Sequence, residues 1–288
     1  MTPTAPLDAV STDFRRFLSL IWLPGEVREV RVPKYNKFGH TASGYFDSPD
    51  TLASAAARWD GRANLYITLN PVNPALLARA ANRIAEKAES TSSDTDVTRR
   101  RWLFIDIDPV RPAGIGSTEA ERQAALEVLV QVISFLSGMG WPEGITAMSG
   151  NGWYLLYSID LPNNGPSLDL VKGALEALAA RFSSESVFID TTVYNAARLA
   201  GLIGSLKVKG DSLPDRPHRR SQLESVPEQL IPVSAELLAA VAAQRPQPDL
   251  TRTPGALATT NSSLCLESIL QEYSIEYQVQ PPDANGIT

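Results

Sequence analysis

Short apolar strand signals alternate with longer helical signals along most of the chain. Helical spacing and capping patterns predict helices over residues 8–22, 48–59, 74–89, 118–136, 168–182 and 234–243. Strand patterns lie between them, at residues 27–32 (half-exposed), 65–69, 102–109, 145–148, 153–159 and 187–190. Strands separated by helices of this length favour an α/β or α+β core, without a transmembrane or solenoid signature. We therefore expect a mixed fold in which residues 1–243 form the main domain.

Two segments near the C-terminus differ in composition from the rest. Residues 244–262 are rich in Pro, Thr and Ser, which is typical of a linker. Residues 263–288 contain one short helical pattern and are too few to fold alone. Either they pack on the main domain, or they begin a domain that is absent from this chain.

The charge of the chain gives no general sign of nucleic-acid binding, but two local segments are basic. The formal net charge is -6, whereas proteins that bind nucleic acid usually show a basic face. Three arginines, Arg99, Arg100 and Arg101, directly precede the strand at residues 102–109, and residues 198–220 hold six Lys or Arg against two Asp. These segments are either solvated loops or contacts to phosphate. The single cysteine, Cys265, excludes an internal disulfide framework and favours a reducing, cytoplasmic setting.

The strand that reads WLFIDIDP ends in two carboxylates, Asp106 and Asp108. Alternate residues of a strand point to the same side, roughly 6 to 7 Å apart, so the pair could share divalent cations. Carboxylate oxygens suit Mg²⁺ or Mn²⁺, and two such ions can hold the attacking and leaving oxygens of a phosphoryl displacement. Alone, the two residues could equally end a strand in any acidic protein.

Two further segments add candidate site residues. Ser149, Gly150, Asn151 and Gly152 form either a plain hairpin turn or a turn whose backbone N–H groups approach a phosphate. Asp190 ends another apolar strand, where it could complete a metal site or simply cap the next turn. The basic residues after it, Arg198, Lys207 and Lys209, could neutralise a triphosphate.

Together, the strings RRRWLFIDIDPVRPAG, SGNGWYLLY and IDTTVYNAARLAGLIGSLKVKGDSLPDRPHRRSQL resemble the archaeo-eukaryotic primase superfamily, the primase-polymerases of phage, plasmid and integrated-element replication. The resemblance covers roughly residues 40–230. It implies an α+β fold that joins an N-terminal α/β module, about residues 1–100, to an RRM-like module, about residues 101–230. The active site would lie in the cleft between the modules.

The resemblance also implies a role for each candidate residue. Asp106, Asp108 and Asp190 would be catalytic and bind two Mg²⁺ or Mn²⁺ ions. Nucleotide binding would involve Ser149, Gly150, Asn151, Gly152, Tyr154, Arg198, Lys207 and Lys209. Nucleic-acid binding would involve Arg99, Arg100, Arg101, Arg216, His218, Arg219 and Arg220, with Trp153 or Tyr194 available for stacking.

The chain departs from the family pattern at a few positions. Tyr154 occupies the place of a histidine that contacts the triphosphate, and a phenol stays neutral near pH 7 where a histidine can be protonated. Gly201, Ile203 and Ser205 stand where a basic residue, an aromatic residue and a threonine are expected. These departures bear on nucleotide binding more than on the fold.

The function expected from the resemblance is template-dependent nucleotidyl transfer, as in a DNA primase or DNA polymerase. The partners would be a single-stranded DNA template with primer and NTP or dNTP, with a helicase domain or protein as a further candidate and no membrane. Two alternatives stay open. One is a catalytically weakened primase-like module that binds nucleotide or nucleic acid in a replication complex. The other is a different enzyme with paired aspartates, such as a glycosyltransferase or a metal nuclease.

Overall fold

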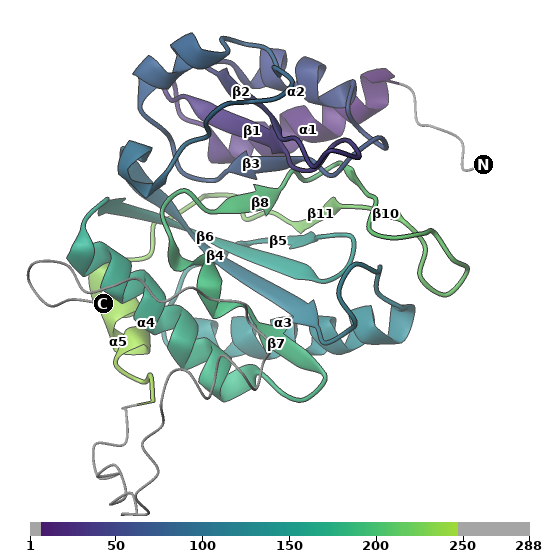
Figure 1. Cartoon of the computed structure of the whole chain (residues 1–288). Helices are drawn as coiled ribbons and strands as arrows, with labels where there is room; N and C mark the ends of the chain where they lie inside the picture. The colour runs from purple at the N-terminus through teal and green to yellow at the C-terminus, as the bar shows by residue number, and fades with distance from the viewer. Residues whose placement is uncertain (1–6, 247–288) are drawn as a thin grey trace, which may run out of the picture. The chain divides into compact units, whose positions relative to one another are not determined.

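The computed structural model describes residues 7–246, which form two antiparallel sheets with helices packed on them (Figure 1). The first sheet has the strand order β2-β1-β3-β8, the second has the order β11-β5-β6-β4-β7, and β10 pairs with β9. The strands are β1 (Arg28–Val32), β2 (Ala42–Phe46), β3 (Tyr66–Thr68), β4 (Arg99–Pro109), β5 (Ile145–Met148), β6 (Trp153–Pro162), β7 (Val187–Ile189), β8 (Leu199–Gly201), β9 (Leu206–Lys207), β10 (Arg219–Arg220) and β11 (Gln222–Ser225). The helices are α1 (Leu7–Ile21), α2 (Pro49–Ala57), α3 (Glu119–Gly138), α4 (Gly165–Phe182) and α5 (Ala235–Ala242), with 3-10 helices η1 (Pro74–Arg79), η2 (Asp94–Asp96) and η3 (Thr191–Tyr194).

This architecture is mixed α+β, as the sequence predicts. Five predicted helices are present within a few residues of their expected bounds, those over residues 8–22, 48–59, 118–136, 168–182 and 234–243. The assignment of modules that the resemblance implies stays a prediction. From residue 247 onward, the predicted linker and the C-terminal segment lie outside the described residues.

The strand β1 is covered on both faces. Val30 belongs to the same hydrophobic core as the buried side of α1. Glu29 points to the opposite face, is 0% exposed, and accepts hydrogen bonds from the Ser43 hydroxyl (2.5 Å) and the Ser92 backbone N–H (3.0 Å). Because these bonds replace water, the carboxylate can be buried at a modest cost. The prediction of a half-exposed strand was therefore wrong: the alternation is present, but the charged side is buried too.

The predicted helix over residues 74–89 is also corrected. Only Pro74–Arg79 is helical, as the 3-10 helix η1, and the chain then runs along β2. Ser43 and Ala85 exchange two backbone hydrogen bonds of 3.0 and 2.9 Å, and the N–H of Tyr45 donates to the carbonyl of Ala80 at 3.1 Å. A free strand edge needs partners for its backbone groups, and this need overrides the helical propensity of an Ala- and Leu-rich segment.

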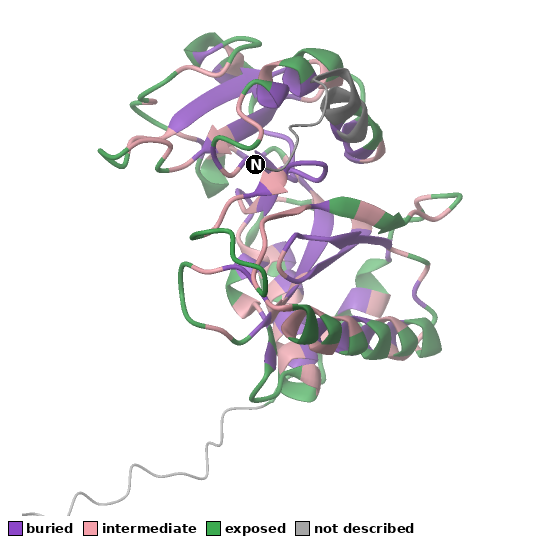
Figure 2. Ribbon diagram, turned by 90° about the vertical axis from the view of Figure 1, so that its right-hand side faces the viewer, coloured by how far each residue is buried: buried purple, intermediate pink, exposed green. Residues whose placement is uncertain are grey.

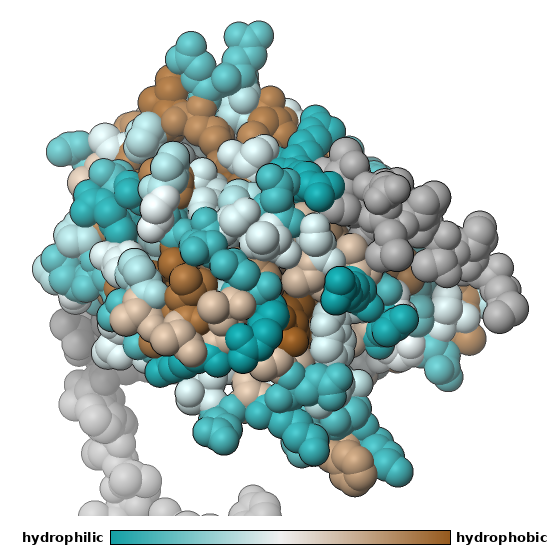
Figure 3. Space-filling model, turned by 90° about the horizontal axis from the view of Figure 1, so that it is seen from above, coloured by the Kyte–Doolittle hydropathy of each residue, from teal (hydrophilic) through white to brown (hydrophobic). Residues whose placement is uncertain are grey.

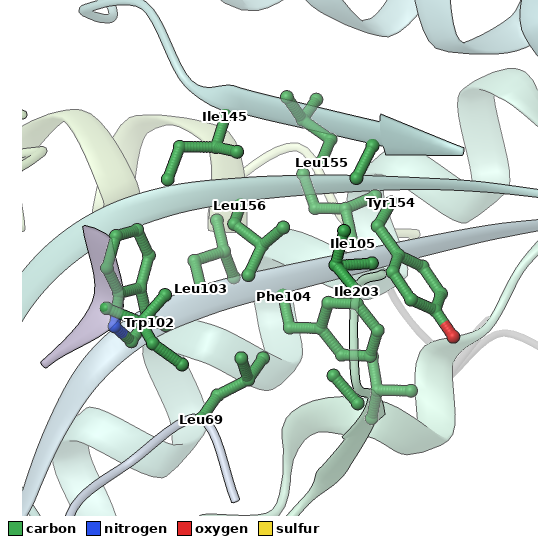
Figure 4. Packing of buried hydrophobic residues seen from close by; sticks show 14 of the residues in the cluster. Leu69, Trp102, Leu103, Phe104, Ile105, Ile145, Tyr154, Leu155, Leu156 and Ile203 are labelled. Carbon is green, nitrogen blue, oxygen red and sulfur yellow. The ribbon is translucent and has the colours of Figure 1, made fainter. Parts of the chain in front are cut away.

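The strand β4 is an interior strand of the second sheet, paired with β6 on one side and with the edge strand β7 on the other. Leu103, Ile105 and Ile107 on one of its faces are each 0% exposed, and Figure 4 shows the first two among their apolar neighbours. Trp153 is the cross-strand partner of Ile107, and its indole N–H donates to the carbonyl of Arg122 in α3 at 3.1 Å. This face is therefore the one that packs on α3, and each buried Leu or Ile there stabilises the fold by about 1.5–3 kcal/mol.

After β7 and η3 the chain leaves the second sheet and adds β8 to the edge of the first. β8 pairs with β3, with Tyr66 opposite Gly201, and the N–H of Leu202 donates to the carbonyl of Leu65 at 2.9 Å. In Figure 1, β8 lies on the side of the first sheet that faces β4 and β6. This crossing brings residues 198–207 next to the second sheet.

Most strands of both sheets are buried, whereas the helices expose one side each (Figure 2). The face seen from above is largely hydrophilic, with a few groups of apolar side chains (Figure 3). Within residues 7–246, no helix combines the length and apolar character needed to cross a membrane.

Candidate functional site

Three aspartates meet where β4 and β7 lie side by side. Asp106 and Asp108 occupy alternate positions near the end of β4, on the face opposite Ile105 and Ile107. The N–H of Asp190, which follows β7, donates to the carbonyl of Asp106 at 2.9 Å. Because Ile107 is paired with Ile189, Asp190 stands opposite Asp106, and opposite residues of an antiparallel pair project to the same face. The structure thus brings the three predicted carboxylates together.

The electrostatics of Asp106 reflect this grouping. Burial raises the pKa of the Asp106 carboxyl well above its usual value, and the negative charges of Asp108 and Asp190 raise it further, while Arg198 and Arg111 act in the opposite direction. Its Oδ1 atom is buried and has no hydrogen-bond partner among the described residues. A buried oxygen without a partner is unfavourable unless a ligand or water completes it.

The donor set fits a hard divalent cation. Carboxylate oxygens are the preferred ligands of Mg²⁺ and Mn²⁺, and the unpartnered Oδ1 of Asp106 is an oxygen that such an ion would satisfy. The three aspartates do not form a finished cage, since within residues 7–246 no group of three or more His, Cys, Asp or Glu is placed to hold a metal ion as it stands. Asp108 lies 3.5 Å from Nη1 of Arg111, and Oδ1 of Asp190 accepts bonds from Thr192.

The turn Ser149–Gly152 is a closed hairpin turn. The N–H of Ser149 donates to the carbonyl of Gly152 at 2.9 Å, and the N–H groups of Asn151 and Gly152 donate to the Ser149 hydroxyl at 3.3 and 2.8 Å. The remaining N–H, of Gly150, contacts the sulfur of Met148 at 2.9 Å. These internal bonds favour the hairpin interpretation, and nucleotide binding by the turn stays a prediction.

Close packing explains the two glycines of this turn. A Cβ at Gly152 would come within 3.0 Å of the Ile107 carbonyl oxygen and would lie 2.5 Å from Oδ1 of Asp108. Gly150 has a φ of 101°, and a Cβ there would lie 2.5 Å from Cγ of Lys207. The turn therefore places the start of β6 against Asp108 and against the aliphatic stem of Lys207.

Tyr154 stands beside Asp106, since the two are cross-strand partners on β6 and β4. Its ring packs edge-on against Phe104 with centroids 4.9 Å apart, and Figure 4 shows the two rings next to each other. Burial raises the pKa of the Tyr154 phenol well above 10.0, and the charges of Asp106 and Asp108 add to the effect. The phenol is therefore neutral, as the sequence predicts for a tyrosine at this position.

Lys207 brings a buried positive charge to the same face. It is 7% exposed, and its Nζ donates to the hydroxyl of Ser205 at 3.1 Å and lies 5.4 Å from the ring centroid of Tyr66. Burial lowers the pKa of Lys207 to about 8, whereas Asp60 and Asp106 favour the charged form. The ammonium form therefore still dominates at pH 7, close to the aspartates.

Arg198 reaches the aspartates from the segment between η3 and β8. Its Nη2 donates to the Thr192 hydroxyl at 2.6 Å, and its charge opposes the rise in the pKa of Asp106. Lys209, two residues beyond Lys207, is half-buried, and among the described residues its side chain has no hydrogen bond or ion pair.

Arg99, Arg100 and Arg101 are the first residues of β4, at the opposite end of the strand from Asp106 and Asp108. Asp106 lies seven positions beyond Arg99 in the sequence, which corresponds to about 23 Å of extended strand. Arg99 and Arg101 both form ion pairs with Asp160. Arg100 is 3% exposed and donates to the carbonyl of Tyr194 at 2.8 Å. The triplet is thus not brought to the aspartates, and the prediction that Arg100 contacts nucleic acid was wrong because its side chain is buried.

The basic residues after β9, between residues 216 and 220, form hydrogen bonds with neighbouring parts of the chain. Arg216 forms two parallel hydrogen bonds of 2.8 Å to the carboxylate of Glu121 in α3, and His218 Nε2 lies 2.8 Å from the carbonyl oxygen of Gly210. Arg219 donates to the carbonyl of Ser117 at 2.7 Å, and Arg220 donates to Asp60 at 2.8 Å. These residues hold the loop in place, so an additional role in nucleic-acid binding stays a prediction.

The sequence analysis did not identify two residues that lie at the site, and it assigned to a third residue a role that its position does not allow. Arg111, beside Asp108, lies in a loop whose path cannot be predicted from a sequence pattern. Tyr66, beside Lys207, comes from β3 in the other sheet. Trp153 was predicted to be available for stacking, but it is 4% exposed and faces α3. An aromatic residue next to a site residue on a strand projects to the other side of the sheet, so the strand period could have corrected this prediction.

No family model matches the chain, and no curated protein sequence matches it. Among solved structures, the chain is similar to primase RepB′, with a TM-score of 0.46 and 11% sequence identity. The aligned region covers 82% of this chain and 62% of that primase, so the chain spans less than two thirds of that protein's length.

Proposed function

We propose that this chain is a template-dependent nucleotidyltransferase of the primase-polymerase type. The observation that carries the proposal is the meeting of Asp106, Asp108 and Asp190 on one face of the second sheet. Two basic residues, Arg198 and Lys207, lie close enough for their charges to act on Asp106. Oxygen ligands beside fixed positive charges suit the transfer of a phosphoryl group, in which positioning and charge stabilisation supply most of the rate.

In this proposal the aspartates hold the metal and the basic residues hold the phosphates. Asp106, with its unpartnered oxygen, and Asp108 are the first ligands, and Asp190 joins them from the adjacent strand. When bound, divalent ions would lower the pKa of the attacking 3′-hydroxyl and stabilise the leaving pyrophosphate. Arg198 and Lys207 would orient the triphosphate, and Tyr154 would donate one neutral hydrogen bond.

The test is extension of a labelled primer on single-stranded DNA, with NTP or dNTP, in Mg²⁺ or Mn²⁺. We expect extension by the wild type and a loss of at least ~100-fold in Asp106→Asn and Asp108→Asn, because loss of a direct ligand costs at least as much as loss of an outer partner. Asp169→Asn is the matched control, since Asp169 is exposed on α4 and forms no ion pair with a described residue. Absence of extension by the wild type under every condition would refute the proposal.

One observation favours a second candidate, a module that binds nucleotide without catalysis. The phenol of Tyr154 is neutral and buried where the family has a histidine, so one positive contact to the triphosphate is lost. Under this alternative, titration with a nucleoside triphosphate and Mn²⁺ would show binding, and the extension assay would show no product. Cleavage of labelled DNA without added nucleotides would instead identify a nuclease.

A further inference from the structure

We propose that Thr192 is a positioning residue that fixes the guanidinium of Arg198 to the carboxylate of Asp190. This inference rests on the proposed function, because it concerns how a phosphate-binding arginine and a metal-binding aspartate are held in a fixed position relative to each other. Thr192 lies in η3, two residues beyond Asp190, and its side chain is exposed, so it is not part of the core.

The hydrogen bonds of Thr192 have only one possible direction. Its hydroxyl lies 2.7 Å from Oδ1 of Asp190 and 2.6 Å from Nη2 of Arg198. An ionised carboxylate only accepts hydrogen bonds and a guanidinium only donates them. The single hydroxyl proton must therefore point to Asp190, and the oxygen must accept from Arg198. Each bond involves a charged group, which makes it stronger than a bond between neutral groups.

This arrangement divides the two oxygens of Asp190 between two tasks. Oδ1 also accepts from the backbone N–H of Thr192 at 2.8 Å, so it caps η3. Among the residues that the structure describes, no donor is bonded to Oδ2, which leaves that oxygen for a metal ion. The interpretation of Asp190 as a cap and its interpretation as a metal ligand are thus compatible, one for each oxygen.

Arg198 depends on Thr192 for its orientation. Within residues 14–246, the bond to Thr192 is the one hydrogen bond that its guanidinium makes, and its Nε is buried without a partner. No carboxylate lies within ion-pair distance of it in the same range of residues. A long side chain held by a single bond is reoriented easily when that bond is lost, because its rotamer freedom is large.

The segment that carries Thr192 is itself anchored. Val193 is 5% exposed, the carbonyl of Tyr194 accepts from Arg100 at 2.8 Å, and the Nζ of Lys172 in α4 lies 5.4 Å from the centroid of the Tyr194 ring. The hydroxyl of Thr192 is therefore presented from a fixed backbone, as a positioning group requires.

The test compares Thr192→Val, which keeps the shape and removes the hydroxyl, with Thr192→Ser, which keeps the hydroxyl. Thr191→Val is the control in the same 3-10 helix, because no described residue bonds to the Thr191 hydroxyl. In primer extension, we expect Thr192→Val to raise the KM for nucleotide about tenfold with a smaller change in kcat. Thr192→Ser should stay near the wild type, and Thr192→Val should have no further effect in the Arg198→Met background.

A second measurement keeps this inference separate from the proposed function. The measurement is the NMR signal of the Arg198 Nε–Hε group in the nucleotide-free full chain, which is assigned by its loss in Arg198→Met. This signal should shift or broaden in Thr192→Val and stay unchanged in Thr191→Val. If the signal responds but the wild type neither binds nor extends nucleotides, the positioning link stands and the proposed function fails. If the signal is unaffected, or if the two valine variants have equal KM values, the positioning role is refuted.

Discussion

Replacing Gly152 by alanine should destabilise the second sheet and displace Asp108. The added Cβ would lie 2.5 Å from Oδ1 of Asp108, whereas ordinary contact begins at 3.4 Å, so the carboxylate would have to move by about 0.9 Å. The other close atom, the carbonyl oxygen of Ile107, belongs to the backbone of β4 and cannot rotate away. Overpacking of this kind costs typically 1–3 kcal/mol, and the backbone contact favours the upper end, about 3 kcal/mol.

This cost can be measured by thermal unfolding followed by circular dichroism. For a unit of this size, about 3 kcal/mol corresponds to a fall in Tm of about 6–12 °C. Primer extension should be lost as well, because Asp108 moves. Gly138→Ala at the end of α3 is the control, since a Cβ there meets no atom within 4 Å. A Gly152→Ala variant with the Tm of the wild type would show that β4 and β6 are not packed as described.

Two further predictions concern the surroundings of the site. Tyr154→His should raise the affinity for nucleoside triphosphate, because an imidazole can carry a positive charge, and lower stability by about 1 kcal/mol through the lost ring contact with Phe104; equal or lower affinity in a titration would contradict this. Glu121→Gln should loosen the loop that contains Arg216, measured as faster hydrogen exchange over residues 210–218. The Arg216 bond lowers the pKa of Glu121 below its usual 4.5, so the stabilisation is complete above pH 4.5 and is lost as the pH falls through the lower, folded-state value. The variant should therefore lose less stability on acidification than the wild type, and an identical acid dependence would count against the pair.

Local patterns predicted the elements that local physics determines. The capping box of Thr118 and Glu121 begins α3, and the carboxylates at the end of WLFIDIDP project from one face of β4. Side-chain spacing and capping act over a few residues, so they can be recognised without knowledge of the tertiary structure.

Features that depend on distant partners could not be predicted in this way. The strands β2 and β8 are short and form the two edges of the first sheet. β2 pairs with β1, and β8 pairs with β3 only after the chain has crossed from the second sheet. The basic residues of the loop after β9 were interpreted from charge alone, and their carboxylate partners, such as Glu121 and Asp60, are about a hundred or more residues away in the sequence. Charge indicates that a phosphate contact is possible, but it cannot show that the cation already has a partner.

The departure at Gly201 has a physical reason that connects the two sheets. A Cβ at this position would come within 3.0 Å of Nζ of Lys207 and would lie 3.0 Å from the phenol oxygen of Tyr154. The space that a basic residue at 201 would need is therefore occupied by the ammonium group of Lys207, which Ser205 supports with a hydrogen bond of 3.1 Å. Lys207 itself supplies a buried positive charge beside Gly201. Gly201 leaves the space for the buried Lys207, and Ser205 accepts a hydrogen bond from it. A larger residue at 201 would force Lys207 away from the aspartates.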